Sequence, residues 1–124
     1  MPALPPRQPS FVRIWRGRTP RSRADAYEAY HHEAGITPLL TKALGVQSFR
    51  EDRGHETEFV TISYWESLEA MRELTGGDPT AVHHLERDPN FLLELPDRVQ
   101  VLRLLSSQGV VRAVADGTSK SLLT

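Results

Sequence analysis

The chain has 124 residues, no cysteine, and a net charge of −1 from 15 basic and 16 acidic side chains. This length suits one domain, and the lack of cysteine excludes disulfides, thiolate metal sites and a cysteine nucleophile. The balanced charge favours neither nucleic acid nor an anionic membrane as a partner. No apolar run approaches the roughly 18 residues that a membrane span requires. We therefore expect a cytoplasmic globular protein.

The composition divides the chain into three parts. Residues 1–10 hold four of the nine prolines and little to bury, so they predict a flexible, extended arm. Residues 106–124 are mostly small and polar and predict a flexible tail. The folded domain is expected at residues 11–105.

The first half of the domain predicts a strand followed by a helix. Alternation over residues 11–18 indicates the strand, and Thr19-Pro20 is typical of a helix cap followed by the first helical position. The helix is expected to end near Ala34, with Gly35 as a left-handed exit. Its inner stripe would carry Tyr27 and His31 where leucines are usual.

The second half predicts a hairpin, a helix and a last strand. Residues 46–51 suggest an edge strand, residues 52–55 a turn, and residues 57–65 a central strand that is rich in β-branched and aromatic residues. Ser67 should cap a helix that buries Leu68, Met71 and Leu74 and ends at Gly76-Gly77. A helical turn is expected over residues 82–85, and the last strand over residues 99–105.

This order of elements predicts an α+β, ferredoxin-like βαββαβ fold with a four-stranded antiparallel sheet. Right-handed crossovers would place the first and third strands in its middle, with both helices on one face. The other face keeps apolar and aromatic residues without a cover. We therefore expect a homodimer that packs sheet against sheet.

Three stretches carry a resemblance to a known family: F-V-R-I-W-R-G-R-T-P, I-S-Y-W-E-S-L-E-A-M-R and F-L-L-E-L-P. Over residues 11–105 the chain resembles the antibiotic biosynthesis monooxygenase family, whose members are dimeric α/β barrels of ferredoxin-like topology. The wider superfamily includes cofactor-free oxygenases of aromatic polyketides, haem-degrading enzymes, small cyclases and isomerases. The resemblance also implies a pocket between sheet and helices, lined by aromatic residues.

Trp15 and Trp65 are candidates for holding a planar substrate in such a pocket, and Ser63 lies on the same strand face as Trp65. Tryptophans on central strands are also ordinary core residues. The sequence alone leaves both interpretations open.

A haem site is the second interpretation that the resemblance raises. In the haem-degrading branch a W-E-S motif is followed, at similar spacing, by a histidine that ligates iron, and His84 stands there. That branch has a tryptophan where this chain has Leu74, and an asparagine that this first strand lacks. Leu74 and His84 are therefore retained as substrate-binding candidates, with haem binding through His84 as an alternative.

Arg13, Tyr27 and His31 are the catalytic candidates. If they converge with Ser63, they supply a general base, a cation for an enolate or phenolate, and hydrogen-bond donors. In the other interpretation His31 packs in the core and Arg13 pairs with a carboxylate.

We thus expect a small cofactor-independent monooxygenase, or a related cyclase or isomerase, acting on an aromatic or polyketide-like molecule. Such chemistry needs a substrate that becomes an electron-rich anion, and a protein that offers a base and a dry pocket. No metal and no cofactor are expected. The alternatives are haem binding and a non-catalytic dimeric module that binds a small ligand.

Overall fold

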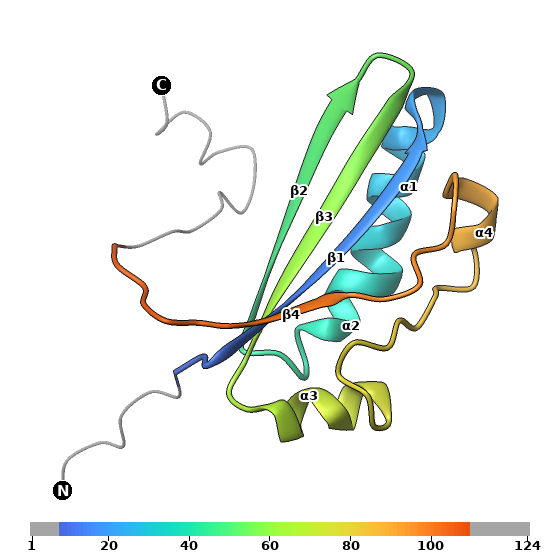
Figure 1. The fold of residues 1–124 in the computed structure, drawn as a ribbon. Helices are drawn as coiled ribbons and strands as arrows, with labels where there is room; N and C mark the ends of the chain where they lie inside the picture. The colour runs from blue at the N-terminus through green and yellow to red at the C-terminus, as the bar shows by residue number, and fades with distance from the viewer. Residues whose placement is uncertain (1–7, 110–124) are drawn as a thin grey trace, which may run out of the picture.

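The computed structural model describes residues 8–109, which form one antiparallel sheet with helices on one side (Figure 1). The strand order β2-β3-β1-β4 places the first and third strands in the middle, as predicted. The ferredoxin-like α+β fold class is thereby confirmed. The elements in chain order are β1 (Phe11–Pro20), η1 (Arg21–Arg23), α1 (Ala24–His31), η2 (His32–Ile36), α2 (Thr37–Leu39), β2 (Gly45–Arg53), β3 (Glu56–Trp65), α3 (Leu68–Thr75), α4 (Asp88–Phe91) and β4 (Gln100–Arg103).

β3 is the central strand, and its two faces differ. The side chains that face the helices are buried from Thr57 to Trp65, while those between them are half-buried. At its end Ser67 caps α3, because its hydroxyl accepts from the Ala70 N–H at 3.1 Å. Gly76 ends α3 in the left-handed conformation with φ 83°. Both ends of this helix match the sequence prediction.

β1 is longer than predicted, and the predicted Thr19 cap is wrong. The strand continues through Thr19 and Pro20, which pair with Thr57 and Glu56 of β3. Pro20 closes the strand with ψ 144°, and the Arg21 N–H then bonds to the His55 carbonyl. Pairing along the whole of β3 outweighs the local helix signal, so the helical segment starts at η1 instead.

The first helix does not end at Gly35. It widens into a π-helical segment, η2, and continues as α2. Gly35 has no positive φ. Its lack of a side chain serves packing instead, because a Cβ there would lie 3.2 Å from Leu85 Cδ1 and 3.4 Å from His31 Nδ1. Single π turns are frequent at functional sites.

The segment between α3 and α4 also differs from prediction. Residues 82–85 form no helical turn, and the flanking Ala81 makes an isolated antiparallel bridge to Arg98. Asp88-Pro89 begins α4, where proline at the first turn needs no N–H partner. On α3 the structure buries Met71 but leaves Leu68 and Leu74 half-buried.

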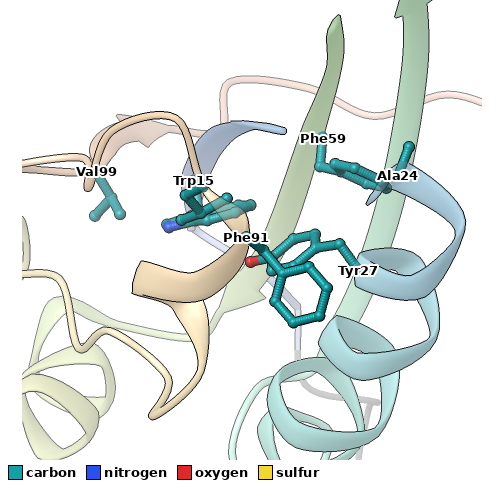
Figure 2. Close-up of a cluster of buried hydrophobic side chains, with 7 residues drawn as sticks. Trp15, Ala24, Tyr27, Phe59, Phe91 and Val99 are labelled. Carbon is teal, nitrogen blue, oxygen red and sulfur yellow. The ribbon is translucent and has the colours of Figure 1, made fainter. Parts of the chain in front are cut away.

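The core lies between the sheet and its helices. Figure 2 shows Trp15 of β1, Phe59 of β3 and Phe91 of α4 gathered around Tyr27 of α1. The ring centroids of Phe59 and Phe91 lie 5.2 Å and 5.3 Å from that of Tyr27. These aromatic contacts supply most of the directional packing in a small domain.

The opposite sheet face has no cover among the described residues. Phe49 of β2 and Leu102 of β4 are 48% and 42% exposed. The strand registers place them on one face with five half-buried or buried residues of the central strands: Val12, Ile14, Val60, Ile62 and Tyr64. The face therefore presents an apolar band across all the strands.

Residues 1–7 of the predicted arm and 110–124 of the predicted tail lie outside the described residues. Within residues 8–109, no helix has the length and apolar character needed to cross a bilayer.

Candidate functional site

A cavity of about 250 Å³ lies between the sheet and the segments η2, α2 and α3. Most of its surface is apolar, and a few polar groups converge in it. Its lining comprises Arg13, Trp15, His31, Ala34, Gly35, Ile36, Pro38, Leu39, Lys42, Thr61, Ser63, Leu74, Val82, His83, Leu85 and Asp88. A pocket between sheet and helices agrees with what the resemblance implied.

Trp15 and His31 form a stacked pair in the cavity wall. Their ring centroids are 4.8 Å apart, with 20° between the planes. The Trp15 indole can lie flat along β1 because the next residue on the same face is Gly17, where a Cβ would approach Trp15 Cη2 to 2.4 Å. Glycine is thus required at this position to seat the indole ring.

His31 is held by a chain of hydrogen bonds that starts at a buried carboxylate. The Tyr27 hydroxyl donates to Asp88 Oδ1 at 3.0 Å, and Tyr27 Oη lies 3.2 Å from His31 Nδ1. Since a tyrosine hydroxyl has one proton, which goes to Asp88, its oxygen accepts from the Nδ1–H of His31. The network therefore assigns the lone pair to Nε2, which accepts from Thr61 Oγ1 at 2.9 Å.

Burial keeps these groups in the protonation states that the chain requires. It lowers the pKa of His31, an effect that the charge of Asp88 opposes and that of His32 reinforces. Burial, followed by the charge of Asp88, raises the pKa of Tyr27 far above its ordinary value. His31 is therefore a neutral base at neutral pH, and Tyr27 keeps its proton.

Arg13 places a cation in the same cavity while only 9% exposed. Its Nε donates to the Pro79 carbonyl at 3.3 Å, and its Nη2 donates to the Ala81 carbonyl. Within residues 8–109 no carboxylate lies within ion-pair distance of it, so the expected alternative of a structural ion pair is absent there. Burial lowers the pKa of Arg13, although a guanidinium remains charged.

Ser63 adds an oriented hydroxyl. The Trp65 Nε1–H donates to Ser63 Oγ at 2.8 Å, and both residues are buried on the same face of β3. Since the oxygen of Ser63 accepts from Trp65, its own proton is available to an acceptor in the cavity. Trp65, 1% exposed, thus acts behind the cavity rather than in its wall.

The structure brings together five of the eight residues predicted for the site. The residues that line the cavity are Arg13, Trp15, His31, Ser63 and Leu74. Tyr27 and Trp65 lie one layer behind them, each bonded to a lining residue. His84 is exposed and is not part of the lining, whereas its neighbour His83 is.

Asp88 and Thr61 are the functional residues that sequence reasoning missed. Thr61 lies two positions before Ser63 on the face that points to the helices, so strand alternation could have found it. Asp88 is 61 positions from Tyr27 in sequence. Its one local signal was the proline after it, which marks a helix start as readily as a break.

Haem does not fit the residues of this cavity. His84, the ligand that the resemblance implied, is exposed and does not line the cavity. Within residues 8–109 no cluster of three histidine or acidic side chains could hold a metal ion either.

Comparison with known proteins supports the fold. A candidate antibiotic biosynthesis monooxygenase from Bacillus cereus matches with a TM-score of 0.58 and 14% identity, covering 83% of this chain and 100% of its own. NE2512, a protein of unknown function from Nitrosomonas europaea, matches with a TM-score of 0.58 and 13% identity, and the match covers 86% of this chain and 100% of NE2512. No family model and no curated protein matches the chain. At these identities the likeness shows the ferredoxin-like architecture, in agreement with the resemblance, and no activity.

Proposed function

We propose that this protein is a cofactor-independent monooxygenase, or a related cyclase or isomerase, for which His31 is the general base. The observation that carries the proposal is the Asp88–Tyr27–His31 chain, which assigns the lone pair of this cavity-lining histidine to Nε2, where it accepts from Thr61. An acidic hydroxyl of an aromatic substrate would take the place of the Thr61 hydroxyl at Nε2, and Thr61 can rotate to another acceptor.

The other polar groups favour the anion that proton removal creates. The buried charge of Arg13 makes the cavity attractive to anions, and Ser63 donates to an oxygen of the ligand. An electron-rich anion can pass an electron to O₂, and the resulting radical and superoxide combine to a hydroperoxide that loses water and leaves a carbonyl on the substrate. Without O₂ the same anion regains its proton or rearranges by cyclisation or isomerisation. The base and the largely apolar cavity are common to these reactions.

The test is oxygen consumption and product formation with a panel of hydroxylated aromatic compounds, under air and under nitrogen. His31→Gln should lower turnover by about 10²- to 10⁴-fold, the usual contribution of a general base. His55→Gln, in the exposed turn between β2 and β3, is the matched control and should leave turnover unchanged. Ligand binding without turnover in the unaltered protein would instead support a non-catalytic binding module.

We also propose that the open sheet face closes a homodimer. Its apolar band includes Phe49 and Leu102, whose exposed area would otherwise face water. Light scattering should give twice the 14.0 kDa mass of one chain.

Ile62→Lys, in the middle of the band, should yield a folded monomer because it places a charge against the partner's sheet. Leu40→Lys is the control, since Leu40 is 52% exposed on the helical side. A stable monomer of the unaltered chain at micromolar concentration would disprove the dimer.

A further inference from the structure

The guanidinium of Arg13 is fixed in orientation but only partly used. Its Nε and Nη2 each donate to a carbonyl of the segment before the Ala81 bridge. A guanidinium carries five N–H donors in one plane, so several remain for a ligand. Because two carbonyls fix that plane, the remaining donors are preorganised, which is the arrangement that suits a planar carboxylate.

The charge of Arg13 also lacks an anion. It is nearly buried, and within residues 8–109 no acidic side chain reaches it. Asp88, the one carboxylate in the lining, is already occupied: Oδ1 accepts from Tyr27, and Oδ2 accepts from the Leu85 N–H at 2.9 Å. A buried cation without a partner is costly, and an anionic ligand would offset that cost.

The size of the cavity limits what that ligand can be. An apolar cavity of about 150 Å³ accommodates benzene, and this one has about 250 Å³. The additional volume, beyond what benzene needs, holds two small substituents on one ring. Three or four fused rings would extend beyond the cavity. The flat surface of the Trp15–His31 pair suits an aromatic ring in particular.

From these observations we propose that the ligand is a single-ring aromatic carboxylate with a ring hydroxyl, a compound of the hydroxybenzoate class. The carboxylate binds Arg13, the ring lies in the apolar part of the cavity, and the hydroxyl meets His31. The contact between the ligand's hydroxyl and His31 depends on the proposed function. The contact between its carboxylate and Arg13 is inferred from Arg13 alone. This ligand is smaller than the aromatic polyketides that members of the wider superfamily oxygenate.

Calorimetric binding to the full chain tests the carboxylate end without any turnover. Benzoate should bind about tenfold to hundredfold more tightly than benzamide, its neutral analogue of nearly the same shape. Raising the salt concentration should change this ratio little, since a buried pair is poorly screened. Anthracene-9-carboxylate, with the same charge on three rings, should not bind. Equal binding of benzoate and benzamide, or tight binding of the anthracene acid, would overturn the inference.

Variants locate the anchor. Arg13→Lys should remove most of the preference for benzoate because an ammonium cannot bind both carboxylate oxygens in one plane. Arg72→Lys, an exposed arginine of α3, is the matched control and should keep it. Loss of the preference in Lys42→Gln but not in Arg13→Lys would place the anchor at Lys42, the other basic side chain with a full charge in the lining, and would refute the proposal.

His31→Gln separates this inference from the proposed function. That variant should keep the preference for benzoate over benzamide within a few-fold, because the carboxylate contacts Arg13 and not His31, although both compounds bind more weakly without the ring of His31. If His31→Gln loses turnover while benzoate and benzamide bind the unaltered protein equally, His31 is supported as the general base and the proposal of a carboxylate ligand is wrong. If benzoate is preferred but no hydroxylated acid is turned over, aromatic carboxylates are supported as the ligand class and the enzymatic proposal is wrong.

Discussion

Asp88→Ala should destabilise the protein by about 2–4 kcal/mol and remove nearly all turnover. The carboxylate is 2% exposed and accepts from both the Tyr27 hydroxyl and the Leu85 N–H. Its removal leaves the Leu85 N–H without its acceptor and takes from the Tyr27 hydroxyl the acceptor that fixes its direction, and each such loss costs about 1–3 kcal/mol. Urea or thermal unfolding measures the loss. Asp97→Ala, at an exposed position, should remain within about 0.5 kcal/mol of the parent.

Asp88→Asn separates the role of the charge from that of the shape. The carboxylate accepts from Tyr27 with one oxygen and from the Leu85 N–H with the other, whereas an amide has only one acceptor oxygen for the two donors. Tyr27 therefore loses its fixed acceptor, and its hydroxyl can donate to His31 Nδ1 instead. This reverses the tautomer of His31. The ring proton moves to Nε2, the atom whose lone pair must be free to act as the base. We expect turnover to fall by about 10²-fold or more.

The residual turnover of Asp88→Asn has a pH signature with a definite sign. The negative charge of Asp88 raises the pKa of His31, against the larger lowering by burial. Without that charge the pKa of His31 falls further, so the acid limb of the pH profile should move to lower pH. An unchanged or higher limb would mean that Asp88 acts through packing alone.

Local chemistry along the second half of the chain was sufficient to predict much of the fold. β3, the cap at Ser67 and the stop at Gly76 each depend on residues within a few positions of one another. Backbone preferences and caps operate over that range, so the sequence expresses them directly. The alternation of strands and helices then allowed few topologies.

The errors occurred where partners are distant in sequence. Thr19-Pro20 carries a sound local helix signal, but pairing with Thr57 and Glu56 keeps both residues in β1. Gly35 was interpreted through backbone conformation, whereas its tightest constraint is the space that Leu85 occupies, since a Cβ there would lie 3.2 Å from Leu85 Cδ1. Neither contact can be inferred from neighbouring residues.

The candidate site shows the same division. Arg13, His31 and Ser63 were found because chemically capable residues on inward faces of adjacent elements are expected to converge. The order of the groups was not predictable: Tyr27 lies behind His31, and Trp65 behind Ser63. His84 was selected by its spacing from the W-E-S motif, but that spacing does not fix which residue of an irregular segment turns inward, and His83 rather than His84 lines the cavity.

Gly17→Ala should disturb the site although residue 17 does not line it. The added Cβ would lie 2.4 Å from Trp15 Cη2, 2.7 Å from Trp15 Cζ2 and 3.2 Å from Leu92 Cδ2. The indole must therefore move, in a core that also contains Leu92. Overpacking of this kind costs about 1–3 kcal/mol. Because Trp15 stacks on His31, its shift should also weaken aromatic ligands and change the near-ultraviolet circular dichroism.

Gly45→Ala is the matched control on β2. There the nearest atom to a new Cβ is Tyr64 Cδ2 at 3.9 Å, an ordinary contact, so stability and ligand binding should remain near those of the parent. A smaller ring supplies the decisive comparison. If the clash with the indole causes the loss, Trp15→Phe should cost less in the Gly17→Ala background than in the parent, and the double-mutant cycle should show a favourable coupling. Additive effects would mean that Gly17 matters for the backbone of β1 and not for the seat of Trp15.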